Sequence, residues 1–175
     1  MFKRDPLSNP EPLIKRVYAY VAYCVGDGPE AEDITSDTFE RALRYRHTYK
    51  SSHGEPIAWL IGISRRCIAD AVKGRLELAE TDDAAAAGDL ESETALRVDM
   101  ARAMETLDER NRELLALRYG ADLTAKQIAD ILEVRTNAVE VALHRALGKL
   151  RTVLEEPSER TAAPVAAEKR PLPEA

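Results

Sequence analysis

Aromatic residues and glycines are scarce in this 175-residue chain, which holds nine of the former and eight of the latter. β-Branched residues do not gather into runs either, so the sequence predicts an all-α protein rather than a sheet. It contains no run of 18 apolar residues, and its N-terminus, MFKRDPLSNPEPL, lacks an apolar signal core. We therefore expect no membrane insertion and a cytoplasmic location.

Patterns that bind metals or carry out catalysis are missing as well. Cys24 and Cys67 stand far apart, and the three histidines have no metal-ligand spacing. The chain has neither a Gly-rich phosphate loop nor a plausible catalytic triad. We expect no metal, no cofactor and no enzymatic activity, with both cysteines buried in helices.

The net charge of −6 is unevenly distributed along the chain. Residues 76–100 hold eight acidic residues and one arginine, and residues 155–175 hold five acidic residues and three basic ones. By contrast, residues 1–75 hold 12 Lys and Arg against 10 acidic residues, and residues 101–154 hold nine against eight. The acidity sits in the middle and the tail, so bulk charge neither excludes DNA nor argues for it.

Apolar residues recur at helical spacing in a first block, residues 1–75. Three helices are predicted there, at about 12–25, 29–46 and from Pro56 onward. The residues expected to face the core are Leu13, Ile14, Val17, Val21, Cys24 and Val25, then Ile34, Thr38, Phe39, Ala42 and Leu43, and finally Ile57, Leu60, Ile61, Ser64, Cys67, Ile68 and Ala71.

Residues 76–91 are acidic and have no apolar stripe, which predicts a flexible linker. A second helical block, residues 92–154, follows it, and the Pro/Ala-rich tail 155–175 is expected to be disordered. Early in this block the residues expected to face inward are Leu96, Met100, Ala103, Met104, Leu107, Leu114, Leu115 and Leu117.

The stretch AKQIADILEVRTNAVEVALHRALGKLR, residues 125–151, reads as a helix, a short turn and a longer helix. Thr124 and Gln127 have capping-box spacing, and Ala129 is small enough for two helices to cross closely. Val134 is expected in the core of the pair. A helix-turn-helix of this kind can place its second helix in the major groove of DNA. The alternative is a plain helical hairpin within a bundle.

These residues resemble the region-four domain of bacterial RNA polymerase sigma factors, especially the extracytoplasmic-function group. The similar motifs are Leu107 to Arg110, Ile128–Ala129 and Leu143 to Ala146. The first block resembles sigma region two, through GDGPEAEDITSDTFERAL (26–43) and AWLIGISRRCIADAVKGR (58–75). Two motif sets in the right order cover residues 10–154, which implies two small helical domains joined by the linker.

The chain departs from the family's usual residues at several positions. Asp108 replaces Pro, Ser36 replaces Gln and Arg66 replaces Asn. In the turn of the helix pair, Glu133 stands at the usual Gly, and Arg135 at the usual capping Ser, which leaves Thr136 as the expected cap. In the second helix, residues 140–142 are Glu-Val-Ala instead of Lys-Ser-Arg.

The resemblance implies three sets of contact residues. Region four would read the −35 promoter element through Arg135, Thr136, Asn137, Glu140, Val141, His144, Arg145 and Lys149. Region two would engage the −10 element through Tyr49, Lys50, His53, Arg65, Arg66, Lys73 and Arg75. Core polymerase would bind Glu32, Asp33, Ser36, Asp37 and Arg41. Read without the family, the same residues are solvated surface charges, an ordinary loop and, for Trp59, core packing.

The resulting hypothesis is an alternative sigma factor that binds core RNA polymerase, directs it to promoters and helps to melt the −10 element. An anti-sigma factor is a further candidate partner. Two alternatives stay open. One is a free-standing helix-turn-helix regulator, and the other is a sigma-like interaction protein that does not read promoter DNA.

Overall fold

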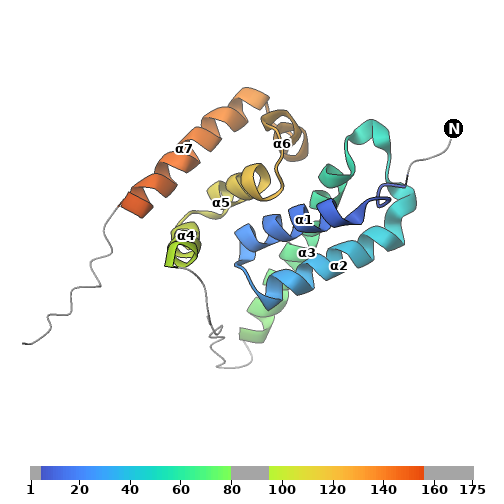
Figure 1. The fold of residues 1–175 in the computed structure, drawn as a ribbon, viewed down its shortest axis with the longest axis horizontal. Coiled ribbons are helices and arrows are strands. Elements are labelled where there is room, and N and C mark those ends of the chain that lie inside the picture. The colour runs from blue at the N-terminus through green and yellow to red at the C-terminus, as the bar shows by residue number, and fades with distance from the viewer. Residues whose placement is uncertain (1–4, 80–94, 156–175) are drawn as a thin grey trace, which may run out of the picture.

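The computed structural model describes residues 5–79 and 95–155, and both ranges are helical without any strand (Figure 1). The all-α prediction is therefore confirmed. The expectations for most of the linker and for the tail beyond residue 155 lie outside the described residues. Below, residues 5–79 are called the N-terminal block and residues 95–155 the C-terminal block.

The N-terminal block is built from three long helices, α1 (Pro10–Val25), α2 (Pro29–Tyr45) and α3 (Pro56–Ala79). Each opens with a proline, whose missing N–H costs nothing in a first turn. Two buried hydroxyls are satisfied within their own helices: Thr38 donates to the carbonyl of Ile34, and Ser64 donates to that of Leu60. The fully buried residues are Val17, Tyr20, Val21, Ala31, Thr38, Ala42, Ile57, Leu60, Ile61 and Ser64.

Three expectations for this block are wrong. Ile14 and Leu43 were expected in the core but are 43% and 57% exposed. Each directly neighbours a residue that turns inward, and consecutive helical positions point about 100° apart, so both cannot face the same partner. In addition, α3 continues through Ala79, so the first residues of the predicted linker are helical.

The C-terminal block contains α4 (Ala95–Glu105), α5 (Glu109–Leu115), a π-helical turn η3 (Ala116–Gly120), α6 (Ala125–Leu132) and α7 (Thr136–Glu155). The capping box of α6 is present as predicted, with Thr124 and Gln127 bonding each other's backbone N–H. Arg112 joins α4 to α5, because its guanidinium donates to the carbonyls of Met104, Glu105 and Leu107 at 3.0–3.1 Å.

The turn between α6 and α7 is close to the predicted one. Glu133 adopts a left-handed conformation with φ 55° and ψ 42°, and Ala129 is only 2% exposed. Thr136 is not the cap: α7 begins at Thr136, and the carbonyl of Arg135 already accepts from Val139 N at 3.2 Å. Val134 is 42% exposed instead of buried, because it lies in the turn itself.

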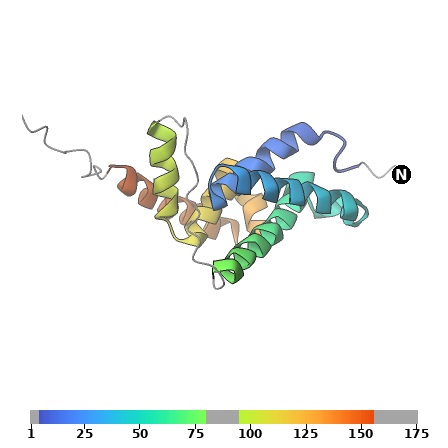
Figure 2. The same ribbon diagram turned by 90° about the horizontal axis from the view of Figure 1, so that it is seen from below.

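The two blocks pack against each other and share one core. α1 lies beside α5 and η3 in both views of the ribbon (Figures 1 and 2). Val17, Tyr20 and Val21 of α1 belong to the same buried cluster as Leu115 and Leu117. The sequence predicted two helical blocks but contained no sign of this contact.

Candidate nucleic-acid interface

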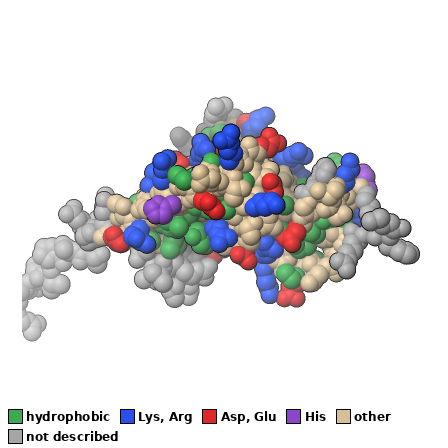
Figure 3. Space-filling model, turned by 90° about the horizontal axis from the view of Figure 1, so that it is seen from above, with side chains coloured by type: hydrophobic (Ala, Val, Ile, Leu, Met, Phe, Trp, Pro, Cys, Tyr) green, Lys and Arg blue, Asp and Glu red, His purple; other side chains and the backbone are tan. Residues whose placement is uncertain are grey.

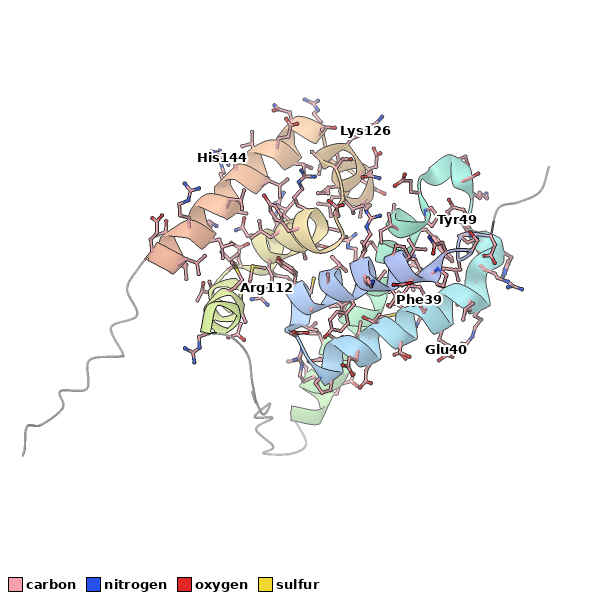
Figure 4. All side chains as sticks on the ribbon, in the orientation of Figure 1. Phe39, Glu40, Tyr49, Arg112, Lys126 and His144 are labelled. Atoms are coloured by element: carbon pink, nitrogen blue, oxygen red, sulfur yellow. The ribbon has the colours of Figure 1, made fainter. Side chains whose placement is uncertain are left out.

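The predicted −35 residues lie together along one exposed face of the helix-turn-helix. All eight side chains are exposed, while Val139, Leu143 and Ala146 on the opposite side of α7 are buried. Figure 4 shows His144 on the outer side of α7 and Lys126 on that of α6. Such a helix can enter the major groove with its first turn and meet phosphates with its later cations.

The charge on this side of the molecule is mixed. Figure 3 shows Lys and Arg side chains spread across it, with acidic side chains between them. Glu140 stands exposed in the second turn of α7. Lys149 already has a partner, since its Nζ lies 3.0 Å from a carboxylate oxygen of Asp108. The recognition face therefore has fewer free cations than the sequence suggests.

Asp108 has a structural role that the sequence analysis did not assign. Its carboxylate accepts from the backbone N–H of Asn111 at 2.9 Å and so caps the N-terminus of α5. That hydrogen bond, together with Lys149, lowers the pKa of Asp108 to about 2. The spacing of Asp108 before the Glu109 helix is a capping signal, which the comparison with the family's proline concealed.

The predicted −10 loop connects α2 to α3 through two short 3₁₀ turns, η1 (Arg46–Thr48) and η2 (Ser51–His53). Tyr49 is only 7% exposed: its hydroxyl donates to the carbonyl of Gly54 at 2.9 Å, and its ring packs against Trp59 at a centroid distance of 5.6 Å. Burial raises the pKa of the Tyr49 hydroxyl. Tyr49 thus shapes the loop from within, and Lys50 remains exposed beside it.

A hollow of about 430 Å³ separates this loop from α6. Tyr49, Lys50 and Trp59 line one side of it, while Gln127 and Asp130 line the other. The two sides are joined where the Gln127 amide donates to the Glu55 carboxylate at 3.0 Å. The first helix of the helix-turn-helix therefore faces the loop that was predicted to capture a base.

Three of the four predicted −10 cations on α3 have acidic partners. Arg65 pairs with Glu113 at 2.7 Å, Lys73 with Glu77 at 3.7 Å and Arg75 with Glu30 at 3.2 Å; Arg66 is exposed. Exposed pairs of this kind contribute about 0–1 kcal/mol each, so phosphates can replace the carboxylates at little cost.

The predicted polymerase-binding residues form an acidic stripe on α2. Glu32, Asp33, Ser36 and Asp37 are exposed on the side away from the buried residues of the helix. The side chain of Glu40 also points outward from α2 (Figure 4). Arg41 differs from the others because it is committed to Asp70 of α3 at 2.8 Å. A docking partner of this stripe would have to be basic.

Neither a metal site nor a membrane span is found in the part of the chain that the structure describes. No three His, Cys, Asp or Glu side chains there converge as metal ligands. No described helix is both long enough and apolar enough to cross a bilayer. Both cysteines are free; Cys67 is buried, whereas Cys24 is half-buried and its pKa is raised to about 12 by burial.

Comparison with known proteins identifies both blocks. The sigma-70 region 2 family matches residues 11–77, and the sigma-70 region 4 family matches residues 97–150. The extracytoplasmic-function RNA polymerase sigma factor BldN of Streptomyces coelicolor is 30% identical over 148 residues. That match covers 79% of this chain and 56% of BldN, so the chain spans little more than half of that relative's length.

Two further relatives agree with this match. The extracytoplasmic-function sigma factor SigK of Mycobacterium ulcerans is 24% identical over 150 residues, which is 80% of both chains. The sigma factor RpoE of Bartonella quintana, solved in complex with the anti-sigma factor NepR, has the same fold. It superposes with a TM-score of 0.68 at 18% identity, over 84% of this chain and 94% of RpoE.

Proposed function

The chain belongs to the extracytoplasmic-function group of the sigma-70 family, and from that premise we propose that it recruits core RNA polymerase to promoters. One observation carries the proposal. Each block keeps a charged face exposed while burying the opposite face, and the two faces are those that the family uses for polymerase and for DNA. We further propose that the protein acts in the cytoplasm and catalyses no reaction itself.

The acidic stripe of α2 is the proposed contact with core polymerase. Four adjacent exposed positions, Glu32, Asp33, Ser36 and Asp37, present three carboxylates and no basic side chain. Arg41, held by Asp70, would mark the edge of this surface and not its centre. Charge complementarity of this kind speeds association and fixes register more than it adds affinity.

The exposed face of α7 is the proposed reader of the −35 element. Its free cations are few, because Lys149 is paired and Glu140 repels phosphate. A protein that held promoter DNA alone would need several more phosphate contacts. A sigma subunit does not, since the polymerase supplies most of that attraction, and a weakly basic helix then suffices for orientation and partial readout.

In region two, the loop around Tyr49 is the proposed site for the −10 element. Tyr49 holds the loop from within, so the groups that meet a base or a phosphate would be the exposed ones, Lys50 and Arg66 among them. Arg65, Lys73 and Arg75 would exchange their carboxylate partners for phosphates. An anti-sigma factor is a proposed regulator, by analogy with RpoE bound to NepR.

Transcription with purified core polymerase on a library of genomic fragments tests the proposal. We expect discrete start sites, preceded by a shared pair of upstream elements, only when both the chain and core polymerase are present. Core polymerase alone is the first control, and footprinting with the chain alone is the second. Start sites that do not differ from those of core polymerase alone would refute the sigma function. A strong footprint without polymerase would indicate a free-standing regulator.

A further inference from the structure

The backbones of the two blocks touch at Gly120. A Cβ atom built on Gly120 would lie 2.8 Å from the Cα of Tyr20 and 2.9 Å from the carbonyl oxygen of Ala19. Both atoms belong to the backbone of α1, which is held from its other side by α2 and α3. Neither can move aside as a flexible side chain would. Only glycine therefore allows η3 to lie this close to α1.

Polar contacts surround this close approach. Arg16 of α1 donates to the carbonyls of Ala121 and Asp122, at 2.8 and 3.0 Å, just beyond the end of η3. Arg65 of α3 pairs with Glu113 of α5 at 2.7 Å. We call the contact of Arg16, Tyr20 and Arg65 with Glu113 and Gly120–Asp122 the interblock seam.

The same arrangement brings the two proposed DNA-reading surfaces close together. Gln127 of α6 touches Glu55 at the end of the −10 loop, and no more than about 25 Å of chain separates Gln127 from the first turn of α7. The −10 and −35 elements are about 25 base pairs apart by definition, or roughly 85 Å on a straight duplex at about 3.4 Å per base pair. With the seam closed, the chain cannot reach both elements.

We propose that the interblock seam is an autoinhibitory contact, which keeps the free protein closed until core polymerase separates the two blocks. The inference rests on the proposed sigma function. Opening exposes apolar residues of α1 and η3 to water, and contacts with polymerase must offset that loss. A seam of this kind lowers the apparent affinity for polymerase by the fraction of molecules that are open. It thereby limits promoter binding by the free chain.

Gly120→Ala tests the seam directly, with Gly62→Ala as the matched control. Gly62 also lies within a helix, α3, but a Cβ atom there would meet nothing within 4 Å. We expect the Gly120 variant to show a larger radius of gyration by small-angle scattering and at least about five-fold tighter binding to core polymerase. The control should match the natural chain in both measurements. Circular dichroism verifies that both variants are folded.

A second variant guards against misfolding at Gly120. Arg16→Gln removes the guanidinium that holds Ala121 and Asp122 but leaves the backbone contact intact. It should shift the radius of gyration and the polymerase affinity in the same direction as Gly120→Ala, by a smaller amount. If Gly120→Ala is unfolded, the outcome for Arg16→Gln decides.

A reversible cross-link provides the converse test. Glu55→Cys and Gln127→Cys, with Cys24 and Cys67 replaced by alanine, are joined by a bismaleimide whose spacer contains a disulfide. We expect the linked chain to lose promoter-directed transcription with core polymerase and to regain it when reductant cleaves the spacer. Should the cysteine pair itself abolish transcription, the scattering and affinity measurements decide alone.

The outcomes separate the two proposals. If the natural chain gives no promoter-directed transcription, the sigma function fails. If it transcribes normally and the linked chain transcribes equally well, the seam does not inhibit. Unchanged size and polymerase affinity in a folded Gly120→Ala chain would also overturn the autoinhibitory contact, and would leave the sigma function intact.

Discussion

The side chains of Asp108 and Lys149 meet at 3.0 Å and tie the N-terminus of α5 to the last third of the recognition helix. Asp108 therefore serves two elements, because it also caps α5 through Asn111. A proline at this position, the usual residue of the family, could do neither. Removing the charge should loosen the attachment of α7 and free Lys149 for DNA.

Asp108→Asn and Asp108→Ala separate the two roles. Asparagine still caps a helix but cannot pair with Lys149, whereas alanine does neither. At neutral pH we expect melting temperatures in the order natural chain, then Asn, then Ala. Since Asn frees Lys149, it should also strengthen promoter binding by holoenzyme slightly. Equal melting temperatures for all three chains would contradict the capping role.

The pH dependence of this effect follows from the lowered pKa of Asp108. Its folded-state pKa is about 2, below the ordinary value of 3.8 that applies when the chain is unfolded. The stabilisation is therefore fully present above about pH 4 and is lost as the pH falls toward 2. The gap in melting temperature between the natural chain and Asp108→Asn should close over that range, as scanning calorimetry at successive pH values can measure.

Local signals predicted most of the helices. The capping box at Thr124, the prolines at the start of each N-terminal helix and the left-handed Glu133 all act within a few residues, so the sequence displays them directly. Apolar spacing was a weaker guide to burial, as Ile14, Leu43 and Val134 show. A periodic stripe indicates a face but does not indicate where the partner of that face ends.

Contacts distant in the sequence could not be predicted in this way. Arg16 and Asp122 are 106 positions apart, and nothing near either residue indicates that they meet. Gly120 had the appearance of an ordinary helix end. The pairing of Lys149 with Asp108 was hidden for the same reason, and the sequence therefore overstated the number of free cations on α7. The exposure of the predicted polymerase and −35 residues, by contrast, agrees with their helical spacing.

Asp33→Arg should weaken binding to core polymerase. The change reverses one charge in the middle of the acidic stripe, without touching the buried side of α2. We expect the dissociation constant to rise roughly three- to ten-fold, the scale of one or two exposed ion pairs. Glu11→Arg is the matched control, because Glu11 lies on α1 and its side chain is 77% exposed. Equal loss of affinity in both variants would indicate a nonspecific effect of charge.

Glu133→Gly should stabilise the protein. Glu133 has a positive φ of 55°, which glycine adopts without the steric cost that a side chain incurs. We expect a gain of about 1 kcal/mol in the free energy of unfolding, measured by urea denaturation. Asp130→Gly, at an exposed position inside α6, should instead lose about 1 kcal/mol. A loss at Glu133 as well would mean that its side chain makes a stabilising contact.

Glu140→Lys should change how the recognition helix holds DNA. Glu140 is exposed in the second turn of α7, where a carboxylate repels phosphate. If it faces the backbone, the substitution should tighten holoenzyme binding on every promoter and steepen the salt dependence by about 0.9 for one added phosphate contact. If Glu140 instead accepts from a cytosine amino group, roughly 1–3 kcal/mol of discrimination should vanish at one −35 position. Glu105→Lys, the same change at the end of α4, controls for net charge. Footprints of holoenzyme on a series of −35 mutants distinguish the two cases. A variant that alters neither affinity nor base preference would show that this face of α7 does not meet DNA.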